Sequence, residues 1–244
     1  MIRLYVENPL LENQDVVLTE NQSHYLQKVM RLKENDDVLL FNGRDGEWKA
    51  RITGTSKKST ILFPITQSRP QRREGDLWLL FSPLKPKRQE FLVEKATELG
   101  VSCLCLVHFE RTSVPKVNFE KMQAHAREAT EQCGRLTLPE IKPLMSLNAL
   151  LKNWPAERFL LFGDESLSSP SLEALNLNPQ KPYAFLVGPE GGFSPQELSL
   201  LKSFPQAQGV TLNPHILRAE TAALVGVSYL QMKTQTVSSL VRNA

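Results

Sequence analysis

The chain has 244 residues, 41% of them hydrophobic, which is enough for one large domain or for a large and a small domain with buried cores. Its net charge is +3, with 29 Lys and Arg residues against 26 Asp and Glu residues, and this permits nucleic-acid binding without requiring it. No stretch approaches the roughly 20 apolar residues that span a bilayer, so the sequence excludes a helical membrane span.

The cysteines and the N-terminus indicate the compartment. The cysteines number three, an odd count, and two of them, Cys103 and Cys105, lie in an apolar run, which argues against a disulfide framework. Their spacing relative to the histidines gives no zinc pattern. Acidic residues interrupt any apolar core that could follow Arg3, so we expect no signal peptide. The sequence therefore predicts a cytoplasmic protein without a metal site.

The first seventy residues are mostly β. Short runs rich in apolar residues predict strands at Leu4 to Val6, Val16 to Leu18, Val38 to Phe41, Trp48 to Ile52 and Ile61 to Ile65. Asn42-Gly43 and Asp45-Gly46 are turn signals between the middle pair, and one short helix is expected from His24 to Arg31. Closure into a small barrel would bury these strands and remove their edges.

A polar segment from Ser68 to Glu74 is the expected domain boundary. Beyond it, strands and helices alternate, as is typical of an α/β domain with a largely parallel sheet. The expected elements are a strand from Leu77 to Phe81, a helix from Arg88 to Leu99, a strand from Val101 to Phe109 and a helix from Phe119 to Cys133. The two helices end at Gly100 and Gly134.

Three apolar runs in the second half each lead into a loop. Phe159 to Phe162 ends at Gly163-Asp164-Glu165, the run ending at Val187 leads into Gly188 to Ser194, and Val210 to Leu212 leads through Asn213-Pro214-His215. Ligands of open α/β sheets bind at the carboxyl ends of the strands. The pattern therefore predicts one composite pocket made by three loops.

The most informative loop runs from Val187 to Glu197. Gly191 and Gly192 permit positive φ and let a flat group approach the main chain, and Ser194 and Glu197 have capping-box spacing with Pro195 at the first helical position. The loop lacks the Lys of a P-loop, and the chain contains no G-x-G-x-x-G fingerprint. The ligand is therefore expected to be neither a nucleoside triphosphate nor a dinucleotide.

The chain resembles the RsmE family of bacterial ribosomal RNA methyltransferases, in the SPOUT superfamily. The matching motifs follow one another over nearly the whole chain: His24 to Arg31, Glu94 to Val101, Glu110 to Ser113, Glu128 to Arg135, Val187 to Ser194 and Ile216 to Ala222. The departures from the family pattern are Asn213-Pro214-His215 and the helix start at Lys85-Pro86-Lys87-Arg88.

The resemblance implies a fold and a cofactor. Residues 1–70 would form a PUA-like RNA-binding β-barrel domain, and residues 74–244 a SPOUT α/β domain with a trefoil knot, although general physics favours an unknotted sheet. The cofactor would be S-adenosylmethionine. The residues implied to bind it are Leu161, Phe162, Gly163, Val187, Gly188, Pro189, Glu190, Gly191, Gly192, Leu212, Asn213, Ile216, Leu217 and Thr221.

The implied reaction is methylation of N3 of a uridine in 16S ribosomal RNA, within the small ribosomal subunit. N3 must lose its proton, so the site needs a base and a cation. Arg218 is the candidate cation because a guanidinium stays charged, with a structural ion pair to Glu190 or Glu220 as the alternative role. Glu190 and Glu220 are the candidate bases, and a carboxylate needs burial or a like charge to act near neutral pH.

Basic residues are the expected RNA contacts, although a lone surface cation is usually only solvated. The candidates are Arg3, His24, Lys28, Arg31, Arg69, Arg72, Arg73, Lys85, Lys87, Arg88, Arg111, Arg127 and Arg135. Small residues in the final helix, Ala222 to Met232, indicate close packing, and the resemblance implies a homodimer through this region. Two other functions stay open: a 2′-O-ribose methyltransferase, and an RNA-binding or ribosome-assembly protein without catalysis.

Overall fold

The computed structural model describes residues 1–72, 74–113 and 116–234, and the chain in it divides into two compact units. The first unit contains residues 1–73 and 130–138, and the second contains residues 74–129 and 139–244. Within the described ranges, no helix is both long and apolar enough to cross a membrane.

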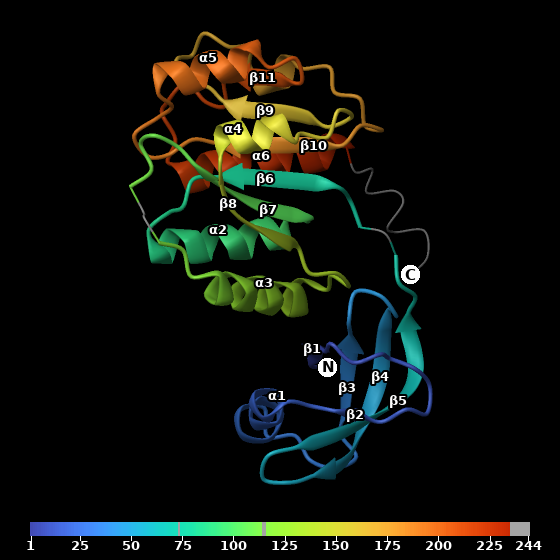
Figure 1. The fold of residues 1–244 in the computed structure, drawn as a ribbon. Coiled ribbons are helices and arrows are strands. Elements are labelled where there is room, and N and C mark those ends of the chain that lie inside the picture. The colour runs from blue at the N-terminus through green and yellow to red at the C-terminus, as the bar shows by residue number, and fades with distance from the viewer. Residues whose placement is uncertain (73, 114–115, 235–244) are drawn as a thin grey trace. The chain divides into compact units, whose positions relative to one another are not determined.

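The first unit is built on a mixed five-stranded sheet (Figure 1). Its strands are β1 (Arg3–Tyr5), β2 (Val16–Val17), β3 (Asp37–Phe41), β4 (Glu47–Thr55) and β5 (Thr60–Arg69), in the order β1-β3-β4-β5-β2. β1 and β3 are parallel, and the other pairs are antiparallel. All five expected strands are therefore confirmed.

The expected closure into a full barrel is not what the pairing shows. β1 and β2 are the two ends of the sheet, and within residues 1–72 they do not pair with each other. The physical reason is their length, three and two residues, which leaves too few backbone groups to close the sheet. The sheet is a half-barrel around a core that includes Val6, Leu26 and Ile52.

The expected short helix is present with an unusual end. α1 (Glu20–His24) begins with a capping box between Thr19 and Gln22, and a π-helix, η1 (Tyr25–Val29), continues it. Leu26 of η1 is fully buried, and Arg31 has a φ of 57° where the chain leaves the helix. A single π-helical turn is rare and often marks a functional surface.

A buried carboxylate joins two arginines of the first unit. Glu47 accepts from Arg3 Nε at 2.7 Å and from Arg69 Nη2 at 2.5 Å, and Ser68 Oγ donates to it at 2.9 Å. Arg3 also donates to the carbonyl oxygens of Thr130, Glu131 and Arg135, at 2.9, 2.9 and 2.6 Å. In this cluster, the Glu47 cluster, both carboxylate oxygens accept hydrogen bonds and all three guanidinium nitrogens of Arg3 donate them.

The second unit contains a parallel six-stranded sheet. Its strands are β6 (Leu77–Phe81), β7 (Cys103–His108), β8 (Glu140–Ser146), β9 (Phe159–Gly163), β10 (Tyr183–Val187) and β11 (Ala207–Val210), in the order β11-β9-β10-β6-β7-β8. The parallel α/β architecture expected from the alternating pattern is confirmed. β8 was not anticipated, and since none of its side chains is fully buried it carries no clear hydrophobic alternation.

Helices cover both faces of this sheet. They are α2 (Pro86–Glu98), α3 (Phe119–Cys133), α4 (Leu147–Lys152), α5 (Pro195–Ser203), α6 (Ala219–Thr234) and the short 3-10 helix η2 (Leu172–Ala174). Gly100 and Gly134, which follow α2 and α3, have φ of 82° and 83°, so the two predicted glycine stops are confirmed.

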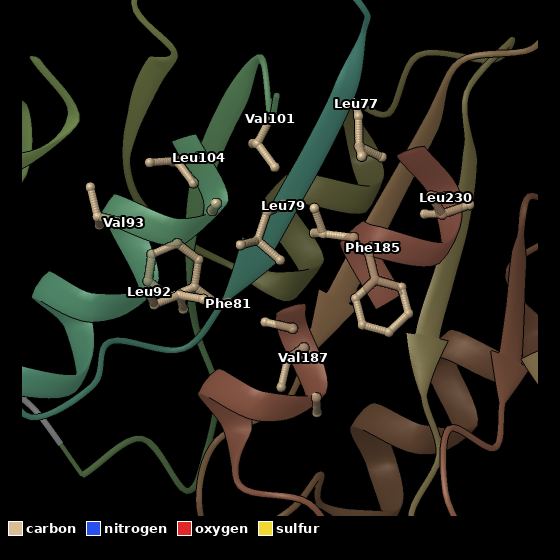
Figure 2. Close-up of a cluster of buried hydrophobic side chains, with 14 of the residues drawn as sticks. Leu77, Leu79, Phe81, Leu92, Val93, Val101, Leu104, Phe185, Val187 and Leu230 are labelled. Carbon is tan, nitrogen blue, oxygen red and sulfur yellow. The ribbon is translucent and has the colours of Figure 1, made fainter. Parts of the chain in front are cut away.

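Each sheet face has its own core. Leucines of α2 and α6 pack with Leu79, Phe81 and Phe185 on one face (Figure 2), and residues of α4 and α5 pack with Leu80 and Phe162 on the other. Cys103 and Cys105 are buried on this second face as free thiols.

α6 packs unusually close to the sheet. A Cβ added at Gly226 would overlap the ring of Phe185, a fully buried residue of β10. Only a residue without a side chain allows this approach. The close packing that the small residues of the final helix predicted is therefore confirmed.

Candidate active site

A cavity of about 340 Å³ lies at the carboxyl ends of β9, β10 and β11. Its size is within the usual range for small-molecule sites. The loops that follow these strands, together with the starts of α2 and α6, supply its walls. The lining residues are Arg88, Gly163, Asp164, Glu165, Leu167, Val187, Gly188, Pro189, Glu190, Gly192, Phe193, Val210, Leu212, Asn213, His215, Ile216, Leu217, Arg218, Ala219 and Ala222.

The three strand ends singled out from the sequence thus meet around one cavity. Parallel pairing causes this, because β9 lies between β10 and β11 and all three point the same way. Ten of the fourteen residues expected to contact a cofactor line the cavity. The other four do not: Leu161 and Phe162 point into the cores on opposite sheet faces, and Gly191 and Thr221 lie outside the lining.

The glycine-rich loop differs in detail from the expectation. Of the two adjacent glycines, only Gly192 has a positive φ, 71°, and a Cβ there would overlap the carboxylate of Glu165. Gly191 lies in ordinary backbone space, and its carbonyl oxygen accepts from Arg111 Nη1 at 3.0 Å. The requirement for glycine at positive φ therefore applies to Gly192, not to Gly191.

The start of α5 anchors this loop. Ser194 and Glu197 form the expected capping box, with Pro195 at the first helical position. Glu197 uses both oxygens: Oε2 accepts from the Ser194 amide at 2.8 Å and Oε1 from the Glu110 amide at 2.8 Å. One side chain thereby links the glycine-rich loop to the loop after β7.

Asp164 was not among the predicted site residues, yet its hydrogen bonds organise the loop after β9. It is buried, and it accepts from the Ser166 amide at 3.0 Å and from Ser169 Oγ at 2.8 Å. Burial raises the pKa of this carboxyl, but the hydrogen bonds from Ser166 and Ser169, with Lys202 nearby, outweigh it and hold the pKa below its usual value. Leu167, at φ 58°, completes this wall. The available signal was a polar residue directly after a buried strand.

Two acidic side chains at the cavity pair with one arginine. Arg88 Nη1 contacts Glu190 Oε1, and Arg88 Nε lies 3.6 Å from Glu220 Oε1. Glu190 lines the cavity, whereas Glu220 is not part of the lining and has 11% of its side chain exposed. Its Oε2 atom is buried and has no hydrogen-bond partner among the residues that the structure describes. Arg88, a predicted RNA contact, thus lines the cavity and pairs with these two carboxylates.

Arg218 is the exposed cation of the cavity. It lines the pocket, and its side chain makes no ion pair or hydrogen bond with the described parts of the chain. The alternative role considered for it, a structural pair with Glu190 or Glu220, is not formed, and both carboxylates pair with Arg88 instead. Arg218 is therefore available to a ligand.

The other basic candidates in the second unit have different surroundings. Lys85 and Lys87 are exposed at the start of α2. Arg111 is exposed but braces the Gly191 carbonyl, and Arg127 is half-buried. Of these candidates, Lys85 and Lys87 expose their charge and form no ion pair with the described residues.

The basic residues of the first unit that were predicted to contact RNA are of two kinds. Arg3 and Arg69 are held by Glu47 and by carbonyl oxygens, so these two stabilise the unit, and Arg135, half-buried, offers its carbonyl oxygen to Arg3. The exposed ones are His24, Lys28, Arg31 and Arg72. Arg73 lies outside the described residues.

The cavity fits a flat cofactor that carries positive charge. Val187, Leu212, Leu217 and Ala222 offer apolar surface, and the acidic residues of the lining, Asp164, Glu165 and Glu190, suit a sulfonium and an ammonium group. In the described part of the chain, no group of three His, Cys, Asp or Glu side chains could hold a metal ion.

Comparison with known proteins agrees with this geometry. Residues 71–231 match the model of the RNA methyltransferase domain, and residues 18–64 match that of the RNA methyltransferase PUA domain. Ribosomal RNA small subunit methyltransferase E of Rickettsia conorii is 30% identical over 94% of this chain and 95% of its own length. The protein of that name from Synechocystis is also 30% identical, over 93% of this chain and 76% of its own.

Solved structures share the whole fold. Ribosomal RNA small subunit methyltransferase E of Neisseria gonorrhoeae, bound to S-adenosyl methionine, superposes with a TM-score of 0.86 at 29% identity, covering 95% of this chain and 97% of that one. A putative methyltransferase of Legionella pneumophila, in complex with the same cofactor, gives a TM-score of 0.84 at 28% identity, over 94% and 96% of the two chains. Fold, cavity and sequence agree: the chain belongs to the ribosomal RNA small subunit methyltransferase E family of RNA methyltransferases.

Proposed function

We propose that this methyltransferase transfers a methyl group from S-adenosylmethionine to N3 of a uridine in 16S ribosomal RNA, within the small ribosomal subunit. The observation that carries the proposal is the cavity at the ends of β9, β10 and β11, in which a free arginine and paired carboxylates adjoin an apolar wall. Relatives with the same fold are named for the small subunit, and two solved ones hold the cofactor.

The cofactor would lie across the three loops. Its adenine fits the apolar wall made by Val187, Leu212 and Leu217, and main-chain groups from Gly188 to Gly192 would make the polar contacts. When bound, it supplies an electrophilic methyl group. Because that group is already reactive, holding the acceptor in line with it lowers the barrier by up to about 7 to 11 kcal/mol, so the loops matter as much as any charged side chain.

The chain's own charged groups would manage the proton and the charge of the uracil. Loss of the N3 proton leaves negative charge on the two flanking carbonyl oxygens, and the Arg218 guanidinium is free to donate to them. Glu190 lines the cavity and Glu220 pairs with Arg88, and these two are the candidate proton acceptors.

The wider assembly is part of the proposal. We infer a PUA-like RNA-binding domain over residues 1–70 and a methyltransferase domain over residues 74–244, whose final strands and α6 form a trefoil knot. The protein would contact RNA phosphates through exposed basic residues, which are His24, Lys28, Arg31, Arg72, Lys85 and Lys87. A homodimer that packs through α6 and a cytoplasmic location complete the proposal.

The experiment is transfer of labelled methyl from S-adenosylmethionine to small subunits prepared from a strain lacking this protein, followed by nucleoside mass spectrometry. N3-methyluridine is the expected product. A ribose-methylated nucleoside would contradict the proposed acceptor, and cofactor binding without transfer to either subunits or naked 16S RNA would contradict the proposed substrate. Subunits that already carry the modification serve as the control, since they should accept no label.

A further inference from the structure

Arg88 joins three segments that are far apart in the sequence. It lies in the first turn of α2, Glu190 lies in the glycine-rich loop 102 residues away, and Glu220 lies in the first turn of α6. The guanidinium contacts the first carboxylate through Nη1 and approaches the second, at 3.6 Å, through Nε. One side chain therefore links the glycine-rich loop to the start of α6.

The planar fork of arginine suits this task. Its donors point in fixed, different directions, so one guanidinium reaches two carboxylates at once, which an ammonium group on a flexible stem does less well. Glu220 has 11% of its side chain exposed, and Arg88 has 32%. The pair with Glu220 is thus partly shielded from water, where an ion pair is screened less than at the surface.

The position of Glu220 links this contact to the proposed cation. Glu220 is two residues after Arg218, at the point where α6 begins, and Glu190 is in the middle of the loop that faces the cofactor site. Fixing both carboxylates therefore fixes the distance between the glycine-rich loop and the start of α6. This spacing in turn sets how far the cofactor, on the glycine-rich loop, would lie from the guanidinium of Arg218, which precedes α6.

We propose that Arg88 is a positioning residue of the methyl-transfer site, which holds the glycine-rich loop against the start of α6 through Glu190 and Glu220. The inference rests on the proposed function for the identity of the cofactor. It replaces the role of Arg88 as an RNA contact, because two carboxylates already lie beside this guanidinium. Lys85 and Lys87, exposed on the same helix start, keep that role.

The test compares Arg88→Ala and Arg88→Lys with Lys95→Ala, which removes a cation from the same helix away from the cavity. Cofactor affinity is measured by calorimetry, and kcat and KM by methyl transfer to small subunits. Arg88→Ala should weaken S-adenosylmethionine binding roughly tenfold and lower kcat further, as expected when one partner of a shielded ion pair is removed. Arg88→Lys should recover part of both losses, and Lys95→Ala should match the wild type.

RNA affinity separates the two roles of Arg88. A phosphate contact predicts that Arg88→Ala weakens RNA binding, flattens its log-log salt dependence by about 0.7 and leaves cofactor affinity unchanged. That result, or wild-type cofactor affinity in Arg88→Ala, would overturn the proposal. If Arg88→Ala does not fold, Arg88→Lys is the variant that tests the proposal. Wild-type cofactor affinity and wild-type kcat in Arg88→Lys would also overturn the proposal.

Failure of the inference is distinguishable from failure of the proposed function. The wild-type protein is assayed for N3-methyluridine in the same experiment, and that product tests the function alone. Cofactor affinity is measured without RNA, so it tests the role of Arg88 whatever nucleoside is methylated.

Discussion

The two units of the molecule each contain a charged cluster of opposite design. In the first unit one carboxylate, Glu47, lies between Arg3 and Arg69, and in the second one arginine, Arg88, lies between Glu190 and Glu220. Both involve side chains that are largely buried, since 4% of the Glu47 side chain and 11% of that of Glu220 is exposed.

They differ in how completely their atoms are satisfied. Glu47 accepts from two arginines and a serine, and the remaining donors of Arg3 reach carbonyl oxygens. Glu220, in contrast, keeps a buried oxygen without a hydrogen-bond partner among the described residues. Complete satisfaction indicates a structural cluster, whereas the Glu220 oxygen can still accept a further hydrogen bond. We therefore expect substitutions in the Glu47 cluster to lower the stability of the first unit, and substitutions at the cavity of the second unit to lower activity.

Glu47→Ala should have the largest effect on stability. Removing the carboxylate leaves the largely buried Arg3 without its ion-pair partner, which costs about 3 to 5 kcal/mol, whereas Arg69 is 43% exposed and stays solvated. Urea unfolding followed by circular dichroism measures this cost. Asp37→Ala is the control in the same unit, because its pairs with Lys49 and Arg51 are more exposed and should contribute at most about 1 kcal/mol. Equal losses in the two variants would contradict the structural role of Glu47.

Arg218→Ala should affect activity and leave stability unchanged. Loss of a donor to a developing anion lowers kcat by about 10² to 10³, while the exposed side chain contributes nothing to packing. Methyl-transfer kinetics, calorimetry with S-adenosylmethionine and thermal unfolding are measured together. Lys233→Ala, an exposed cation later in α6, is the control. A joint fall in cofactor affinity and thermal midpoint would make Arg218 structural instead.

Gly226→Ala tests whether the stability of the second unit rests on packing. The added methyl would overlap the buried Phe185 ring, and relief of that overlap by shifting α6 costs about 1 to 3 kcal/mol. Ser228→Ala, on the same helix, should change stability by less than about 0.5 kcal/mol. If chemical denaturation finds the two variants alike, the close approach of α6 to β10 is not required.

Gly192→Ala and Gly191→Ala form a matched pair in the glycine-rich loop. Only the first places a Cβ at positive φ, at a strain of about 1 to 2 kcal/mol. Cofactor affinity should fall roughly tenfold in Gly192→Ala, at 1.4 kcal/mol per factor of ten, and little in Gly191→Ala. Equal affinities by calorimetry would show that the loop adapts to a side chain at either position.

The smallest effect is a dependence of stability on acid pH. Burial raises the pKa of Glu47, but hydrogen bonds from Arg69, Arg3 and Ser68 outweigh it and leave the pKa below its usual value of 4.5. Because the folded pKa is depressed, this stabilisation is complete above the unfolded pKa and is lost as the pH falls through the folded one. Thermal midpoints should therefore fall more steeply below about pH 4.5 in the wild type than in Glu47→Gln, and parallel curves would contradict this.

Local patterns predicted most of the fold. β6 and α3 match their expected bounds, and Gly100, Gly134 and Ser194 end or begin helices as their residue types indicate. These features depend on a few neighbouring residues, so single-sequence reasoning reaches them. β8 and the half-barrel were missed because one lacks a buried face and the other depends on which short strands pair.

The sequence predicted the pocket in outline, and the structure adds which charges meet. The sequence by itself determined that three strand ends with polar or glycine-bearing loops would form one pocket, since parallel strands present their carboxyl ends at one edge. It could not determine that Arg3 and Arg69 stabilise a domain, that Arg88 faces two carboxylates or that Arg218 stays free. Their partners lie up to 132 residues away in the sequence. An ion pair depends on distance in space, and only the tertiary structure decides which charges meet.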